Sequence, residues 1–348
     1  MKGRVSTVSG PRRVLMIFGL TLLILLLLGG GYIFFSPMLQ RDKGEVVPGS
    51  ADWMAKLPDD LRLNEISLPG THDSAATYVQ MAFFAKCQTK SISAQLQAGF
   101  RYLDIRLAVE KDKLVLTHGS MRCKRGSQLF SANLYLEDAL EECRAFLREH
   151  PTETILFAVK QEDGEESIAD FQKILHRYIN TAPSVWLLTD HFPPLEEARG
   201  KIVLLRRYQD EGQWEEEAGI PLIWMDQGNT EEMESHTAAH AQPPAQALFS
   251  HILYTLWVQD RYKYPAEEKW AAFTAGLHNA SYGADTLALH FLSTRGSAAL
   301  GRPYGFAKDL NKRLSLYEGL PDQCGWVIMD FGTAPLAAKI YDQNFNRP

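Results

Sequence analysis

The sequence lacks the features that mark zinc proteins and nucleic-acid-binding proteins. It has four cysteines in 348 residues, none of them in a C-x-x-C pair or at zinc-ligand spacing from a histidine. A structural zinc site is therefore not predicted. The net charge is -6 and no basic stripe interrupts the chain, which argues against a nucleic-acid partner. After these exclusions, the composition fits an ordinary globular enzyme or binding module.

The scarcity of cysteine also limits disulfides. Cys143 lies on an amphipathic pattern and Cys324 just before an apolar run, so both are predicted to be buried thiols. Cys87 and Cys123 lie in predicted loops. A bridge between these two and two free thiols are both compatible with the sequence.

One apolar run is long enough to cross a membrane. Residues 14–35 are uncharged over 22 positions and follow the basic residues of the first 13. We expect a cytoplasmic segment 1–13, a single-pass transmembrane anchor 14–36, a tether 37–51 and a folded domain 52–348 outside the cytoplasm, at the cell surface or in the periplasm. A cleaved signal peptide is the alternative, but its apolar part is shorter and ends in a small-residue cleavage site.

Short apolar, β-branched runs alternate with helical patterns over the rest of the chain, which predicts an α/β fold. Eight such runs favour an irregular (β/α)8 barrel of the TIM type over an open sheet; they cover residues 64–70, 101–109, 113–119, 154–161, 201–208, 253–260, 286–293 and 325–331. A ninth run, 221–227, fits a loop or an extra strand. The acidic and Pro/Ala-rich parts of 209–253 are expected to form a solvated loop.

Polar residues capable of chemistry stand at the ends of these runs. Taken singly, each has a simpler explanation as a rim charge, a packed core histidine or a helix cap. In a parallel barrel, however, the carboxyl ends of all strands open onto one mouth, where active sites lie. The sequence therefore predicts one site built from His72, Asp73, Asp104, Arg106, His118, Lys160, Arg207, Asp260, Tyr262, His290 and Asp330.

The residues around these positions resemble the bacterial type of phosphatidylinositol-specific phospholipase C. The stretches are "ISLPGTHDSA", "RYLDIRL" followed by "LTHG", "PTETILFAVKQE", "ARGKIVLLRRY", "VQDRYK" and "GWVIMDF", in order between about Trp53 and Asn344. The family fold is an irregular eight-stranded barrel. The resemblance implies cleavage of phosphatidylinositol-type lipids to diacylglycerol and a cyclic inositol phosphate, and we expect a monomer. A non-catalytic surface barrel that binds lipid headgroups or a protein is the alternative.

The resemblance also implies roles for the catalytic residues. His72 would be the general base that takes the proton of the inositol 2-hydroxyl, and Asp330 would hold its ring. His118 would be the general acid that protonates the departing diacylglycerol oxygen, with Asp73 as its partner. A base and an acid on opposite sides of phosphorus suit imidazoles, whose ordinary pKa is about 6.5.

The remaining roles concern phosphate and sugar. Arg106 would stabilise charge on the phosphate, with Asp104 beside it in the pocket. An arginine at this point would repel a divalent cation and can supply the positive charge itself, so neither a metal nor another cofactor is predicted. The predicted contacts to the inositol ring are hydrogen bonds from Lys160, Arg207 and Asp260 and stacking on Tyr262. Residues 78–87, with Phe83 and Phe84, fit either a lipid-facing rim or a buried helix face.

Overall fold

The computed structural model describes residues 10–128, 130–208, 219–224, 226–228, 245–247, 254–297 and 301–346. The chain divides into two compact units, residues 1–40 and 41–348. The first unit contains helix α1 (Gly10–Leu39). Within the part of the chain that the structure describes, no helix combines the length and the apolar character needed to cross a membrane. The predicted transmembrane anchor over 14–36 is therefore not supported by the structure.

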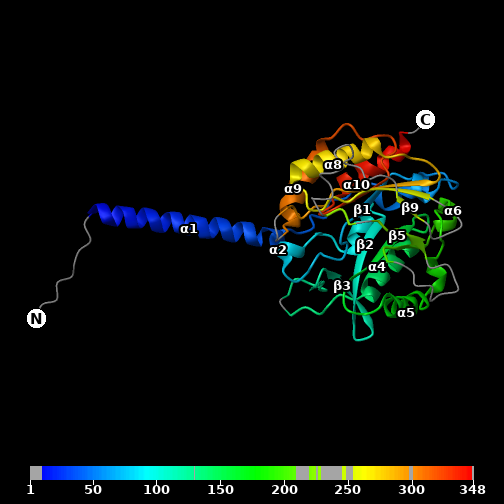
Figure 1. Ribbon diagram of the computed structural model, residues 1–348, viewed down its shortest axis with the longest axis horizontal. Helices are drawn as coiled ribbons and strands as arrows, with labels where there is room; N and C mark the ends of the chain where they lie inside the picture. The colour runs from blue at the N-terminus through cyan, green and yellow to red at the C-terminus, as the bar shows by residue number, and fades with distance from the viewer. Residues whose placement is uncertain are drawn as a thin grey trace, which may run out of the picture. The chain divides into compact units, whose positions relative to one another are not determined.

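Parallel strands form the centre of the second unit (Figure 1), and eight of them are paired in one continuous order. They lie side by side in the order β8, β7, β5, β2, β1, β12, β11, β10. Their bounds are β1 (Leu68–Thr71), β2 (Tyr102–Glu110), β5 (Ile155–Asp163), β7 (Ile202–Arg206), β8 (Ile220–Pro221), β10 (Tyr254–Gln259), β11 (Thr286–Phe291) and β12 (Trp326–Met329). The predicted parallel α/β arrangement is confirmed.

The barrel is incomplete between β8 and β10. Within the described residues no strand ladder joins this pair. Side chains bridge the gap instead: the Tyr254 hydroxyl donates to the Pro221 carbonyl, and Gln227 Nε2 donates to the Val258 carbonyl at 3.1 Å. The predicted closed barrel is therefore seen only in part. Much of the expected solvated loop 209–253 lies outside the described residues.

One predicted strand has the opposite direction. The run 113–119 forms β3 (Lys113–His118), which pairs antiparallel with β2 and then with β4 (Met121–Arg122). The two residues that connect β2 and β3, Lys111 and Asp112, have φ values of 50° and 60°, as in the two-residue turns of hairpins. A parallel connection needs a dozen or more residues. The ninth run supplies the eighth parallel strand, since β8 ends at its first residue.

Helices surround the sheet, and two further short strands extend it, β6 pairing parallel with β7 and β9 antiparallel with β10. They are α2 (Ala82–Ala85), α3 (Ile92–Gln97), α4 (Leu136–Glu149), α5 (Ile168–Ile179), β6 (Trp186–Leu187), α6 (Leu195–Ala198), β9 (Ala245–Ala247), α8 (Ala266–Asn279), α9 (Pro303–Leu316) and α10 (Ala334–Tyr341). The described residues of the second unit also form four 3₁₀ segments: η1 (Ser50–Lys56), η2 (Leu63–Glu65), η3 (Pro183–Val185) and η4 (Asp342–Phe345). Helix α4 shows why they pack, because Leu136, Leu140, Cys143 and Leu147 recur at helical spacing and are buried.

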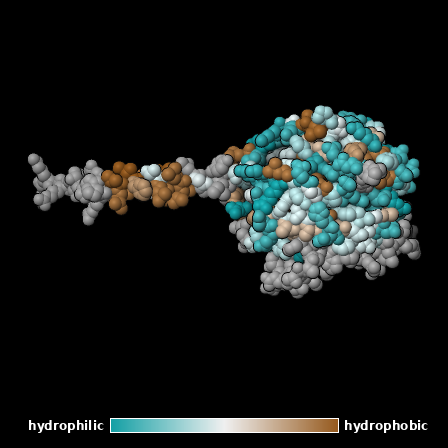
Figure 2. Space-filling model, turned by 90° about the horizontal axis from the view of Figure 1, so that it is seen from above, coloured by the Kyte–Doolittle hydropathy of each residue, from teal (hydrophilic) through white to brown (hydrophobic). Residues whose placement is uncertain are grey.

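The core divides into two clusters that share strand β2. Tyr102 belongs to one cluster, whereas its neighbour Leu103 belongs to the other, with Ile105. Successive side chains of a strand point to opposite faces, so the strands are apolar on both sides, as parallel strands covered by helices require. The face of the domain seen in Figure 2 is mainly hydrophilic, with small scattered apolar areas.

All four cysteines are buried free thiols. The prediction for Cys143 and Cys324 is confirmed. The bridge between Cys87 and Cys123, one of two alternatives, is not formed. Cys123 lies in the second core cluster, whereas the Cys87 sulfur lies beside His118.

Candidate active site

The turn after β1 sets the position of the first two polar residues. Gly70 lets β1 approach β2, because a Cβ there would lie 2.8 Å from Tyr102 Cβ. The His72 amide donates to the Met329 carbonyl at 3.0 Å, which ties the turn to β12. Asp73 has φ 43°, a left-handed conformation that is uncommon outside glycine. Its amide donates to Asp104 Oδ2 at 3.1 Å, so neighbouring strands fix this turn.

The His72 ring is held at both nitrogens. Nδ1 lies 2.8 Å from Asp330 Oδ1, and Nε2 lies 2.8 Å from Arg106 Nη2. Because a guanidinium only donates, Nε2 accepts and the proton of the neutral ring is on Nδ1, donated to Asp330. Burial alone lowers the pKa of His72, but Asp330 and Asp73 outweigh burial and the opposing charge of Arg106, so the pKa lies above its usual value.

Arg106 stands at the centre of a network of carboxylates. Its Nε lies 3.1 Å from Asp104 Oδ2, its Nη1 lies 2.8 Å from Glu162 Oε1, and the same Nη1 is 3.4 Å from Asp73 Oδ2. Glu162 also pairs with Lys160 at 2.5 Å. Burial alone raises the pKa of Glu162, but Arg106 and Lys160 outweigh it and lower the pKa to about 2.

Asp104 lies behind two arginines. Its other oxygen, Oδ1, accepts from Arg207 Nη1 at 2.9 Å, and its side chain is fully buried. Burial alone would raise the pKa of Asp104, but Arg106 and Arg207 hold it well below its usual range. Asp104 is therefore ionised and orients both guanidinium groups from below, rather than facing the pocket as expected.

His118 is the last residue of the antiparallel strand β3 and lies at the mouth of the barrel. Its Nδ1 lies 2.8 Å from the Ala85 carbonyl, so Nδ1 donates and Nε2 is directed towards Asp73. The distance from Nε2 to Asp73 Oδ2 is 3.6 Å, which is beyond hydrogen-bond range. The expected partnership of His118 and Asp73 is thus a charge contact. The rings of His72 and His118 have centroids 6.1 Å apart.

Asp73 has an oxygen without a hydrogen bond. Oδ2 is buried and has no hydrogen-bond partner among the residues that the structure describes, although Arg106 and both histidines lie within 3.6 Å. Burial raises the pKa of Asp73 and outweighs the opposing effect of Arg106. An unbonded buried carboxylate oxygen is costly to maintain, which is typical of a functional site rather than a structural ion pair.

A cavity of about 670 Å³ opens in front of these residues. Asp73 and Asp104 lie behind its wall. His290 lies elsewhere in the fold, where burial and Lys269 lower its pKa to about 3. The cavity brings together eight of the predicted residues: His72, Arg106, His118, Lys160, Arg207, Asp260, Tyr262 and Asp330.

Sequence reasoning missed several residues of the site. Glu162 follows Lys160 by two positions on β5 and so shares its face, a signal that could have been read. Trp224 gave no such signal, yet the Arg207 guanidinium stacks 4.3 Å from its ring and its Nε1 donates to Asp260 at 3.3 Å. Asp226 also lines the cavity.

The rim candidate 78–87 is a loop with one short helix. Helix α2 (Ala82–Ala85) supplies Phe84 to the cavity, and the Met81 side chain is 59% exposed. It is therefore neither a long buried helix face nor a broad apolar surface.

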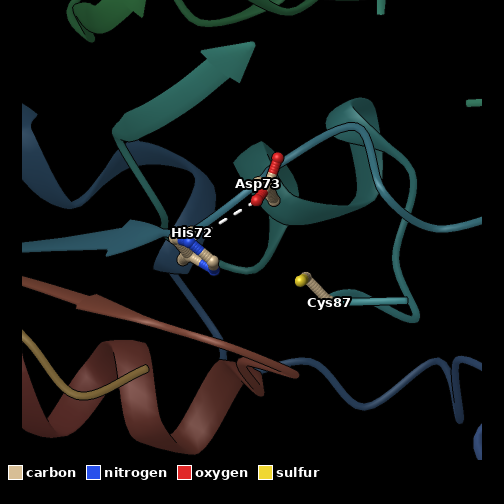
Figure 3. A group of neighbouring side chains, drawn as sticks. All are labelled: His72, Asp73 and Cys87. Atoms are coloured by element: carbon tan, nitrogen blue, oxygen red, sulfur yellow. Dashed lines mark ion pairs between the residues drawn. The ribbon is translucent and has the colours of Figure 1, made fainter. Parts of the chain in front are cut away.

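Three ligand atoms meet as they would around a metal ion. Atoms of His72, Asp73 and Cys87 lie within 4.8 Å of one another, and Figure 3 shows the thiol directed from a separate loop towards the other two side chains. The donor types fit zinc, but the charge does not. Arg106 lies 2.8 Å from His72 Nε2 and 3.4 Å from Asp73, so its guanidinium opposes a divalent cation at this place.

Comparison with known proteins finds a family match for the region that contains much of this site. Residues 66–208 match the family model "Phosphatidylinositol-specific phospholipase C, X domain". This match covers less than half of the chain and shows that residues 66–208 are similar to that domain. The phospholipase C match spans β1 to β7, whereas Asp260, Tyr262 and Asp330 lie beyond it.

Individual phospholipase C relatives extend the match. A 1-phosphatidylinositol phosphodiesterase of Staphylococcus aureus (strain Newman) is 26% identical over 84% of this chain and 94% of its own length. The enzyme of the same name from Listeria monocytogenes is 34% identical over 44% of this chain and 47% of its own length. The structure of a mutant phosphatidylinositol-specific phospholipase C from Staphylococcus aureus superimposes with a TM-score of 0.67 at 25% identity, covering 85% of this chain and 96% of that one.

Proposed function

We propose that this protein cleaves phosphatidylinositol-type lipids by intramolecular attack of the inositol 2-hydroxyl on phosphorus. The products would be diacylglycerol and a cyclic inositol phosphate, so the reaction is that of a phosphoric diester lyase. The observation that carries the proposal is the pair of imidazoles with ring centroids 6.1 Å apart. Each has its Nδ1 within 2.8 Å of an oxygen at the back of the site, and Arg106 stands beside them.

His72 suits the role of general base. Its proton is on Nδ1, where Asp330 holds it at 2.8 Å, so Nε2 is the free basic atom. In the substrate-free site Nε2 accepts from Arg106. A bound phosphate would attract the guanidinium and free Nε2 to take the hydroxyl proton. The Asp330 carboxylate then stabilises the imidazolium that forms.

His118 suits the role of general acid. As the bond from the 2-oxygen to phosphorus forms, the bond from phosphorus to the glycerol oxygen breaks, and that oxygen needs a proton. The Nε2 of His118 would supply it, since Nδ1 is engaged with the Ala85 carbonyl. Asp73 Oδ2 lies 3.6 Å from Nε2.

Arg106 would stabilise the charge that develops on phosphate. Three carboxylates surround it, and they fix the guanidinium before substrate arrives, as electrostatic preorganisation requires. A cation supplied by the protein makes a metal unnecessary for this step, so we propose that the reaction needs none. The inositol ring would then lie against Tyr262, with hydroxyl groups near Lys160, Arg207 and Asp260, which line the same cavity.

The direct test is phosphorus NMR of the products from phosphatidylinositol vesicles in EDTA. We expect the wild-type chain to give a cyclic phosphate signal. His72→Ala and His118→Ala should each lose it, with kcat lowered by about 10²–10⁴-fold. Turnover that requires added calcium would contradict the role of Arg106. Tight headgroup binding without turnover would instead support a non-catalytic surface barrel.

The assembly state and the location stay predictions. Sedimentation of the full chain would test the expected monomer. Cell fractionation with protease protection would test the predicted position of residues 52–348 outside the cytoplasm.

A further inference from the structure

Cys87 occupies a place in the site to which no role has been given. It lies on the chain after α2, and its side chain is fully buried. The backbone around it is fixed, since its amide donates to the Ala76 carbonyl at 3.0 Å and its carbonyl accepts from the Phe331 amide at 2.7 Å. The thiol is therefore held at a set position beside Asp330, the residue before Phe331.

The thiol contacts the supports of both histidines. Its sulfur lies 3.6 Å from His118 Nδ1, the nitrogen that donates to the Ala85 carbonyl. On its other side the thiol interacts electrostatically with the Asp330 carboxylate, which accepts from His72 Nδ1. The atoms form a continuous path behind the cavity, from the His72 ring through Asp330 and Cys87 to the His118 ring.

We propose that Cys87 is a positioning residue that links the general base to the general acid. It does so by donating to the Asp330 carboxylate while its sulfur packs against the back of the His118 ring. The inference rests on the proposed function for the roles of the two histidines. The sulfur takes no part in bond making, because burial raises the pKa of the Cys87 thiol well above its usual value and keeps it protonated.

The geometry predicts an electrostatic effect with a definite sign. A donor to Asp330 spreads part of the carboxylate charge, so removing the thiol leaves more of that charge to act on His72. The His72 imidazolium then becomes more stable, and the pKa of His72 rises further. The other charged groups that face His72 are Asp73 on its own turn, Arg106 on β2 and His118 on β3. The substitution leaves all of them in place.

The experiment compares the full-length wild type with Cys87→Ala, Cys87→Ser and Cys143→Ala. Cys143 is a matched control, because it is another fully buried free thiol but lies on α4. Histidine NMR titrations report the pKa of His72, and vesicle assays report kcat and KM on phosphatidylinositol. Unfolding in urea shows which variants are folded.

We expect Cys87→Ala to raise the pKa of His72 by about 0.5 and to lower kcat roughly 3- to 10-fold at a KM within about 2-fold of the wild type. Cys87→Ser should recover much of both, since a hydroxyl also donates. A folded Cys87→Ala with unchanged His72 titration and kcat would overturn the proposal, as would an equal shift in Cys143→Ala. The titration needs no turnover, so an inactive wild type with a shifted His72 would refute the proposed function and leave the link between Cys87 and Asp330 supported.

Discussion

Two arginines of the β2 segment, Arg101 just before the strand and Arg106 in its middle, are both held by carboxylates but have different roles. Arg101, just before the strand, is fully buried with Glu153, and its nitrogens also donate to the carbonyls of Leu96, Phe100 and Ala51. Arg106, five residues on, has 12% of its side chain exposed to the cavity. The first guanidinium has its donors occupied by the fold, whereas the second can turn to a ligand.

The carboxylates differ in the same way. Glu153 meets a single guanidinium in a closed arrangement. Around Arg106 there are three carboxylates, and one of them, Asp73, has an oxygen without a hydrogen bond. The difference shows that the ion pair alone does not distinguish structure from function. Unsatisfied atoms and access to a cavity do.

The sharpest test of this comparison replaces each arginine by methionine. Arg106→Met should lower kcat/KM about 10²–10³-fold, because the developing phosphate charge loses its fixed cation, while Asp104 keeps Arg207 and Glu162 keeps Lys160. Arg101→Met should leave the buried Glu153 without its cationic partner and cost about 3–5 kcal/mol of unfolding free energy. Urea unfolding and steady-state kinetics on both variants measure the two effects. The comparison fails if Arg101→Met is as stable as the wild type.

The fall of kcat/KM at acidic pH, the acidic limb of the pH profile, tests the role of His72 as the general base. His72 must be neutral to act as base, and its pKa lies above 6.5. We expect kcat/KM to fall about tenfold per pH unit below that pKa. In Asp330→Asn burial becomes the dominant influence, so the limb should move to lower pH as kcat falls.

His150→Gln is the control for this limb, since His150 pairs with Asp52 and does not line the cavity. Its profile should coincide with that of the wild type. A limb in Asp330→Asn that stays in place would exclude His72 as the titrating base.

Of these substitutions, Glu162→Gln should have the smallest effect, which is on the pH dependence of the unfolding free energy. The pKa of Glu162 is lowered from 4.5 to about 2, so its contribution to stability is present above pH 4.5 and is lost as the pH falls from about 4.5 to 2. Glu162→Gln lacks this contribution and should lose stability less steeply over that range, by roughly 1–2 kcal/mol. Urea unfolding at several pH values measures the slope. The exposed Glu196→Gln should keep the wild-type slope, and an identical slope in Glu162→Gln would contradict the ion pair.

The sequence predicted those elements that a short local pattern of residues reveals. Apolar alternation marked the strands, because each buries both faces against neighbours. Pro69 and Gly70 lie within β1, where the close approach of β2 leaves room only for glycine, and the turn begins after them at His72. The strand ends revealed His72, Arg106 and Asp330, because parallel strands bring their carboxyl ends to one mouth.

Tertiary structure alone decided the rest. The direction of β3 depends on a two-residue turn, and β8 on pairing with β7, neither of which an apolar run reveals. Asp104 and Arg106 share a face of β2, but only packing places Asp104 beneath two arginines and out of the cavity. Cys87 and Trp224 stand far in sequence from the residues they contact. Their roles arise from long-range contacts, which the periodicity of a single segment does not encode.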